Sequence, residues 1–262
     1  MLDAVLLVGG GFLAGALGGL LGIGGGVVLM PLLRFVAGLS PARAAGTCIL
    51  AVFFTTLGGS YRHFKLGHLN IRLILPVIVS GVAATAVFSL LFVPLATHGR
   101  WLDLGIGLVL SLIALRMVAE ALARSTGLMC DDRTDSAVKD SLWRKVTIGG
   151  FAGVFPGLLG IGTGVILVPA FTFVLRMPIK IAVASSLTSF CANALVSSAF
   201  KLTQGFIDLG VALPLCAGAL LGSNVGAVLN KRFQSNTVKL LFALVFTLVS
   251  VRFIWSSFRG LE

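Results

Sequence analysis

The chain is poor in charged residues, and those that it has are mostly basic. Only 11% of its 262 residues are Asp, Glu, Lys or Arg, against roughly 25% in soluble domains. Hydrophobic residues make up 57% of the sequence, and the mean hydropathy is +1.06. A helix of about 20 apolar residues crosses a hydrocarbon core of roughly 30 Å. The composition therefore excludes a soluble domain and predicts an all-α integral membrane protein.

Acidic side chains are especially scarce, and none falls in the middle of an apolar segment. Five of the nine lie at segment ends, namely Asp3, Asp103, Glu120, Asp208 and Glu262, and the other four lie between residues 124 and 145. Carriers of cations or protons commonly place a carboxylate inside the membrane. The chain is therefore poorly suited to a cation substrate or to a carboxylate proton relay.

Motifs for metal binding and catalysis are also lacking. The four cysteines, Cys48, Cys130, Cys191 and Cys216, form no CxxC pair, so we expect neither a disulfide framework nor a zinc site. Two nearby histidines, His63 and His68, are too few for a transition-metal pathway, and no HExxH motif or Ser/His/Asp arrangement is present. We therefore expect no enzymatic activity, no metal and no cofactor.

What the chain does contain is two similar sets of four apolar stretches. They cover residues 4–38, 44–61, 71–97, 102–123, 146–176, 180–200, 206–229 and 237–258. Residues 19–31 match residues 157–169 at an offset of 138, which also pairs Gly67 with Gly205 and Pro76 with Pro214. We expect two homologous transmembrane halves, 1–123 and 146–262, joined by a polar cytoplasmic linker at 124–145. Such internal duplication is typical of transporters.

The first apolar stretch of each half is too long for one straight crossing, since 35 residues would make a helix of roughly 50 Å. Glycine clusters at 22–26 and 160–164 divide each stretch into two short arms. This pattern predicts a glycine-broken re-entrant or discontinuous helix pair in each half, followed by three transmembrane helices.

The basic residues favour an inverted repeat. If each first stretch returns to its starting side, the Lys and Arg residues divide 14 to 6, with the linker on the richer side; if each crosses once, they divide 12 to 8. The positive-inside rule prefers the first arrangement and places the linker in the cytoplasm and both termini outside the inner membrane. The net charge of +11 is thus explained by topology, and we expect no nucleic-acid partner.

The glycines suggest two roles. Gly11, Gly15 and Gly19, with their copies Gly149, Gly153 and Gly157, are spaced four apart, which lets helices pack closely. The denser clusters exceed what packing needs, because each glycine costs about 1 kcal/mol relative to Ala in a helix. Clustered glycines leave backbone N–H groups free near the middle of the membrane, where they can bind a small anion without a buried cation. Packing alone remains the alternative reading, and the repetition favours the anion site.

Hydroxyl groups on the second stretch of each half are candidate ligands for the same anion. Any one of them can instead bond to a carbonyl of its own helix. The candidate substrate-binding residues are Gly22, Gly24, Gly25, Gly26, Thr47, Cys48, Gly160, Gly162, Thr163, Gly164, Ser185, Ser186, Thr188 and Asn193. Arg62, His63, Lys65, His68 and Lys201 are expected in the loops that follow, either setting topology or forming a cationic vestibule.

Several motifs resemble the TauE/SafE family of sulfite exporters and related transporters. They are the paired GGLLGIGGGVVLMPLL and PGLLGIGTGVILVPAF motifs, the segments ARAAGTCIL and IAVASSLTS, and the turns KLGHLN and LTQGFID. The resemblance covers nearly the whole chain and implies a cytoplasmic-membrane transporter of sulfite, organosulfonates or similar anions. Cys48 is a departure, since it stands where the family usually has Ser.

Alternatives remain open at this level. The substrate is either a sulfur-containing anion or another small organic anion, and export is the favoured direction because an inside-negative potential drives anions outward. A non-transport membrane protein, such as an assembly subunit or an intramembrane enzyme, is the competing class. The sequence leaves the coupling ion open, and also whether the chain forms a homodimer.

Overall fold

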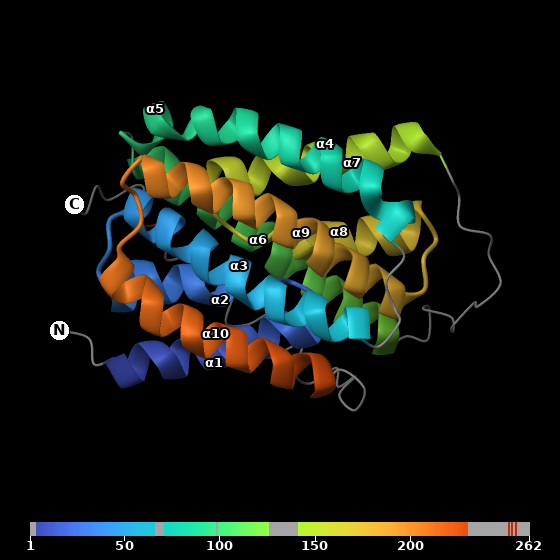
Figure 1. Ribbon diagram of the computed structural model, residues 1–262, viewed down its shortest axis with the longest axis horizontal. Helices are drawn as coiled ribbons and strands as arrows, with labels where there is room; N and C mark the ends of the chain where they lie inside the picture. The colour runs from blue at the N-terminus through green and yellow to red at the C-terminus, as the bar shows by residue number, and fades with distance from the viewer. Residues whose placement is uncertain are drawn as a thin grey trace.

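The computed structural model describes residues 4–65, 71–97, 99–125 and 141–229, together with residues 251, 253 and 255, and this part of the chain is all-helical (Figure 1). The first half contains α1 (Ala4–Leu21), α2 (Gly26–Pro31), the π-helical turn η1 (Leu32–Val36), α3 (Pro41–Lys65), α4 (Ile71–Leu90), α5 (Phe92–Ala96) and α6 (Gly99–Ser125). The second half contains α7 (Leu142–Leu158), α8 (Gly164–Pro169), the π-helical turn η2 (Ala170–Val174), α9 (Ile179–Thr203) and α10 (Leu209–Leu229).

Each half begins with two helices separated by a glycine break, as the clusters predict. The first break covers residues 22–25, between α1 and α2, and the second covers residues 159–163, between α7 and α8. The short second arm of each pair ends in a π-helical turn that begins directly after a proline, Pro31 or Pro169. The same succession of elements in both halves follows from the sequence duplication.

The four-residue glycine ladders are packing surfaces. A Cβ atom built on any ladder glycine of α1 would collide with the backbone of α10, and one on the ladder of α7 would collide with α4. The contacts pair Gly11 with Leu215, Gly15 with Ala219, Gly19 with Ser223, Gly149 with Val77, Gly153 with Gly81, and Gly157 with Thr85 and Phe88. The first helix of each half therefore packs on the other half, and small residues let the two backbones meet.

These contacts also fix the helix directions. Residue numbers rise together along α1 and α10 and along α7 and α4, so each pair is parallel. Helices α3 and α9 are antiparallel, because Gly59 lies against Leu187 while Thr56 and Phe190 both lie against Gly24. Helix α3 is parallel to α10, since Gly46 meets Phe206 and Gly58 meets Ser223. Helices α1 and α3 thus run the same way, and the chain returns through α2 and η1.

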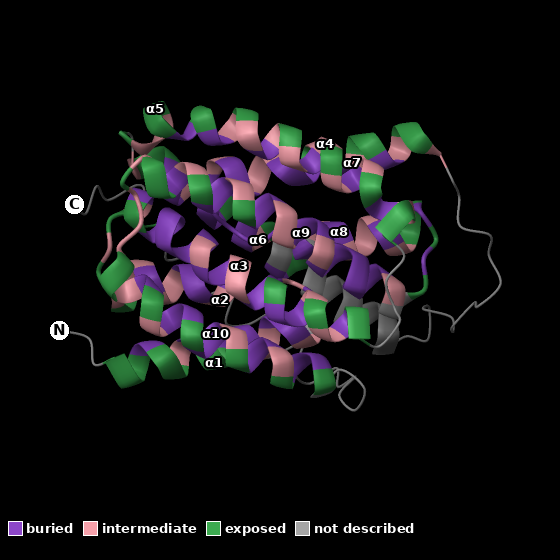
Figure 2. Cartoon of the chain, viewed as in Figure 1, coloured by how far each residue is buried: buried purple, intermediate pink, exposed green. Residues whose placement is uncertain are grey.

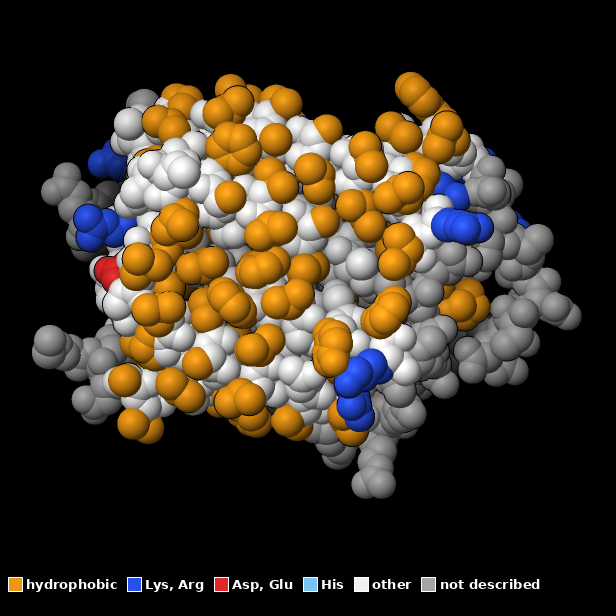
Figure 3. Space-filling model, viewed as in Figure 1, with side chains coloured by type: hydrophobic (Ala, Val, Ile, Leu, Met, Phe, Trp, Pro, Cys, Tyr) orange, Lys and Arg blue, Asp and Glu red, His pale blue; other side chains and the backbone are white. Residues whose placement is uncertain are grey.

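The surface is that of a membrane protein. Helices α3, α4, α9 and α10 are each long and apolar enough to cross a bilayer. Large hydrophobic side chains such as Val5, Leu75 and Leu213 are more than half exposed. Hydrophobic side chains cover the middle of the visible face in Figure 3, with Lys and Arg near its two ends. The buried side chains gather where the helices face one another (Figure 2), and α3 and α9 are more buried than α4 and α10.

Two predicted regions lie partly outside the described residues. Helix α6 extends to Ser125 and α7 begins at Leu142, so both ends of the expected polar linker are helical, while residues 126–140 are not described. Of the last apolar stretch only residues 251, 253 and 255 are described, all helical. Phe253 is fully buried and its ring lies 4.6 Å from that of Phe35.

Candidate functional site

The two glycine breaks touch each other in the interior of the protein. A Cβ atom built on Gly162 would lie 2.6 Å from the carbonyl oxygen of Ile23, and one on Gly26 would lie 2.8 Å from the amide nitrogen of Gly162. A Cβ on Gly164 would collide with the carbonyl oxygen of Gly22. Side chains at these positions would hold the breaks apart, so glycine is needed for the approach. The two clusters predicted to form one site are therefore brought together.

Helices α3 and α9 flank the breaks with equivalent residues. Cys48 of α3 donates its thiol to the carbonyl of Gly26 at 3.6 Å, and Ser186 of α9, which is 138 residues further on, donates its hydroxyl to the carbonyl of Gly22 at 3.4 Å. Both side chains are fully buried. At this shared position the first half thus has the thiol of Cys48, where the second half has the hydroxyl of Ser186.

A phenylalanine covers the point where the breaks meet. Phe190 of α9 is fully buried, and its ring lies 2.6 Å from a Cβ built on Gly24 and 3.2 Å from one built on Gly162. The equivalent residue of α3 is Val52, which lies 2.9 Å from a Cβ built on Gly26. Sequence analysis did not single out Phe190, because an aromatic residue on an apolar helix is most often core.

Two predicted ligands have other partners. The hydroxyl of Thr47 accepts a hydrogen bond from the backbone N–H of Asp208 at 3.1 Å, which ties α3 to the start of α10. The hydroxyl of Thr188 donates to the carbonyl of Ala184 on its own helix at 2.9 Å. Both hydroxyls thus satisfy backbone groups, as Ser and Thr hydroxyls commonly do.

Four buried polar atoms on the second break and on α9 have no hydrogen-bond partner in the described part of the chain. They are Thr163 Oγ1, Ser185 Oγ, Ser189 Oγ and Asn193 Oδ1. Leaving such a group unpaired costs about 1–3 kcal/mol, so a cluster of them indicates a place for water or a ligand. Their counterparts 138 residues earlier are Gly25, Thr47, Ala51 and Thr55, of which both threonines are hydrogen-bonded. At these four positions the unpaired groups belong to the second half, whereas those of the first half lie elsewhere, at Ser60, Arg62 and Ser89.

The prediction that Lys201 lies in a loop is wrong. Lys201 is on α9 and is fully buried. Its ammonium donates to the carbonyls of Pro156 at 2.8 Å and Gly157 at 2.9 Å and to the hydroxyl of Ser197 at 2.9 Å. It also lies 4.4 Å from the ring centroid of Phe92. A cation at the carboxyl end of a helix satisfies its last carbonyls, because these carry partial negative charge.

The other expected loop cations are also helical. Arg62, His63 and Lys65 lie on the last turns of α3, and His63 is buried, whereas His68 lies outside the described residues. Neither reading of this group, topology-setting charge or vestibule, places a lysine inside the protein. The burial of Lys201 was not predicted, because this residue follows the last apolar residue of its stretch, where an interfacial and a buried position look the same in the sequence.

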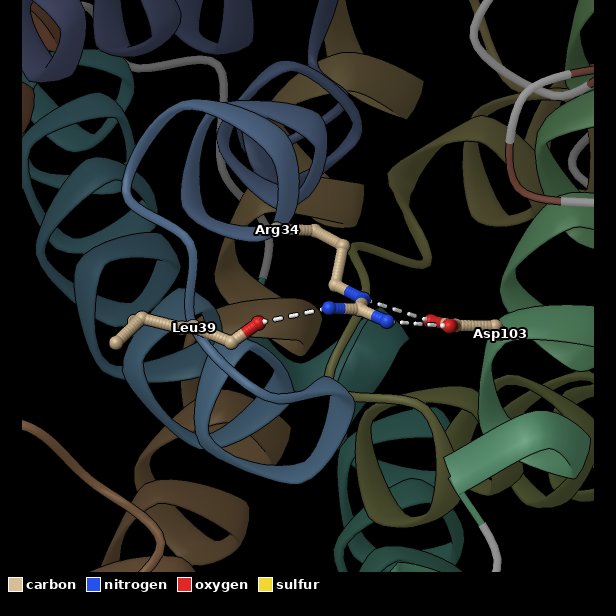
Figure 4. Close-up of polar contacts among 3 residues, drawn as sticks. All are labelled: Arg34, Leu39 and Asp103. Atoms are coloured by element: carbon tan, nitrogen blue, oxygen red, sulfur yellow. Dashed lines mark hydrogen bonds and ion pairs between the residues drawn. The ribbon is translucent and has the colours of Figure 1, made fainter. Parts of the chain in front are cut away.

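An ion pair fixes the second arm of the first half. Arg34 of η1 donates to Asp103 of α6 through two nitrogens, at 2.9 and 3.2 Å, and to the carbonyl of Leu39 at 3.2 Å (Figure 4). Asp103 is almost fully buried, so its carboxylate is bound away from the breaks. The counterpart of Arg34 is Thr172, and the second half therefore lacks this pair.

Comparison with known proteins decides the family. The sequence pattern of the sulfite exporter TauE/SafE family matches residues 7–253. The chain belongs to this family. It is 26% identical over 270 residues to the probable membrane transporter protein YunE of Bacillus subtilis, covering 96% of this chain and 97% of that protein. It is 30% identical over 267 residues to a probable membrane transporter protein of Haemophilus influenzae, covering 92% and 94%.

A plant relative shares a shorter region. The sulfite exporter TauE/SafE family protein 6 of Arabidopsis thaliana is 44% identical over 59 residues, covering 22% of this chain and 14% of that protein. No solved structure matches the chain. Membership of the TauE/SafE family confirms the resemblance seen in the sequence, and with it that the protein is a multi-pass membrane transporter and not an enzyme.

Proposed function

We propose that this TauE/SafE protein transports a small sulfur-containing anion, sulfite or an organosulfonate, and binds it between the two glycine breaks near the middle of the membrane. The observation that carries the proposal is the meeting of two backbone breaks, the second of which contains the unpaired buried hydroxyl of Thr163. Both carboxylates whose side chains the structure describes are engaged elsewhere, Asp103 with Arg34 and Asp208 with its own helix. The surroundings of the breaks therefore suit an anion.

Neutral ligands also suit transport. Backbone N–H groups and hydroxyls bind an anion through several weak contacts, which allows it to leave again. An inside-negative potential drives an anion outward by about 2.3 kcal/mol per charge per 100 mV, so net export needs no carboxylate relay. The family name refers to sulfite, which makes sulfite the first substrate to test.

The same proposal includes the topology. We infer that the halves, 1–123 and 146–262, form an inverted repeat in the inner membrane, with the linker at 124–145 in the cytoplasm and both termini outside. The antiparallel course of α3 and α9 supports opposite orientations, and the 14 to 6 division of basic residues supports the sidedness. Single cysteines replacing Lys139 and Glu262 in a cysteine-free variant should be labelled from opposite sides by an impermeant reagent. Equal labelling, or labelling of position 139 alone from outside, contradicts this topology.

Flux of sulfite into liposomes containing the purified protein tests the function. We expect Gly162→Ala to abolish most of the flux, because the added methyl group would meet the Ile23 carbonyl and the Phe190 ring. Gly150→Ala is the matched control on the same half, since a Cβ at Gly150 meets nothing within 4 Å. Absence of sulfite flux in the wild type, or equal flux in both variants, removes the proposed site.

A further inference from the structure

The helices that precede the two breaks end in different ways. In the first half the carbonyl of Gly18 accepts hydrogen bonds from the backbone N–H groups of Ile23 at 3.1 Å and Gly24 at 3.4 Å. The first break is therefore closed by its own backbone, in the manner of a helix carboxyl-terminal cap. The two N–H groups are used, and they are not available to a ligand.

In the second half side chains take the place of the backbone. The carbonyl equivalent to that of Gly18 belongs to Pro156, at the offset of 138. It accepts from Ser197 Oγ at 2.6 Å and from Lys201 Nζ at 2.8 Å. Both donors come from α9, the helix that also carries Phe190.

Because side chains occupy the Pro156 carbonyl, two backbone N–H groups of the second break have no acceptor in the described part of the chain. Ile161 and Gly162 are the counterparts of Ile23 and Gly24, and in the described part of the chain their N–H groups make no hydrogen bond. Both residues are buried. The hydroxyl of Thr163, the next residue, is fully buried and also without a partner. Buried N–H groups are rarely left unpaired, so three adjacent unpaired groups indicate a ligand.

We propose that Lys201, together with Ser197, is a positioning residue that keeps the second break open, so that the N–H groups of Ile161 and Gly162 and the hydroxyl of Thr163 bind the oxygens of the anion. The inference rests on the proposed function and adds that the site is one-sided. In the first break the equivalent N–H groups of Ile23 and Gly24 are bonded to the Gly18 carbonyl, so this pair of donors comes from the second break.

Lysine is suited to this task. Its ammonium has three donors, and the structure gives it three oxygen acceptors, on Pro156, Gly157 and Ser197, while the Phe92 ring faces the same charge. All three N–H groups of the ammonium are therefore used within the protein, and Lys201 does not bind the anion directly. Without it, the Pro156 carbonyl becomes available to the N–H groups of Ile161 and Gly162, as the Gly18 carbonyl is in the first half. The second break would then close as the first one does.

Kinetics of sulfite flux test the role. We expect Lys201→Met to raise KM by about tenfold, the loss of one hydrogen bond to a charged ligand, with a smaller change in the maximal rate. Ser197→Ala should raise KM less, since Lys201 still holds the carbonyl. The matched control is Ser198→Ala on the same helix, because its hydroxyl bonds to the Leu195 carbonyl of α9 itself; its KM should stay near the wild-type value. An unchanged KM in Lys201→Met, or an equal rise in Ser198→Ala, overturns the inference.

Hydrogen exchange of the wild-type protein provides a test that does not depend on the variants folding. Sulfite should slow amide exchange of Ile161 and Gly162 more than that of Ile23 and Gly24, because the N–H groups of Ile23 and Gly24 are already bonded to the Gly18 carbonyl. Equal protection of the two breaks, or greater protection of the first, rejects a one-sided site. A wild-type protein that transports no sulfite refutes the proposed function itself, whereas normal transport with unaltered KM in Lys201→Met refutes only the role of Lys201.

Discussion

The two glycine breaks occupy equivalent places in the two halves, but their backbones are constrained differently. Four of the five residues from 22 to 26 are glycine, against three of the five from 160 to 164. Gly22, Gly24 and Gly25 of the first break have positive φ angles, whereas in the second break only Gly160 does. A left-handed backbone lets the first break fold back on the end of α1 and satisfy itself. In the second break, the N–H groups of Ile161 and Gly162 have no acceptor within the described residues.

The side chains on the flanking helices α3 and α9 also differ between the halves. At equivalent positions α3 carries Cys48, Val52, Thr55 and His63, where α9 carries Ser186, Phe190, Asn193 and Lys201. The second half therefore has the larger apolar side chain, Phe190, and the more polar groups Ser186, Asn193 and Lys201. Duplication has kept the glycine breaks in both halves, while at the positions of Thr163, Ser185, Ser189 and Asn193 only the second half has buried polar atoms without a partner in the described part of the chain. Packing should thus respond alike in the two halves, and binding should not.

The largest effect is expected at the packing ladders, where the halves should behave alike. Gly11→Ala and Gly149→Ala should each strongly reduce the amount of folded protein, because the new methyl group collides with the backbone of α10 or α4. Gly9→Ala and Gly150→Ala are matched controls on the same helices, with nothing within 4 Å of the added atom. These should keep or raise stability, by up to about 1 kcal/mol, since alanine is the better helix former. Size-exclusion profiles and thermal melting of the purified variants measure the difference, and equal losses in variants and controls would show that the ladders are not the packing surface.

An intermediate effect is expected at the breaks, where the halves should differ. Thr163→Val removes a buried hydroxyl that has no partner in the described part of the chain and keeps the side-chain volume. If this hydroxyl binds the anion, KM for sulfite should rise by about tenfold, with thermal stability unchanged or improved. Thr55→Val on α3 is the control, because its hydroxyl bonds to the Ala51 carbonyl of its own helix. A KM that is insensitive to Thr163→Val would assign the hydroxyl to packing.

Sequence reasoning predicted an all-α membrane fold and a helix break in each half because both depend on composition and local spacing. Glycines spaced by four have few uses other than close helix contact, and a run of five residues with four glycines cannot continue a helix cheaply. The roles of Lys201 and Arg34 depend instead on which distant groups the fold places beside them, Pro156 and Asp103. The same limit explains Thr47 and Thr188, whose chemistry fits an anion but whose hydroxyls have backbone partners.

The smallest expected effect concerns the shape of the site. Phe190 occupies the position in the second half that Val52 occupies in the first. The ring fills the space beside Gly24 and Gly162, so it limits the size of any group that enters between the breaks. Phe190→Leu should shorten this side chain at a cost of about 1–2 kcal/mol in stability. Competition against sulfite flux should then show severalfold better binding of an aromatic sulfonate relative to methanesulfonate. Phe171→Leu, equally buried but on η2, controls for general loosening of the core. If both variants change the ratio equally, or neither does, the ring is a packing element and the limit on substrate size lies elsewhere along the path.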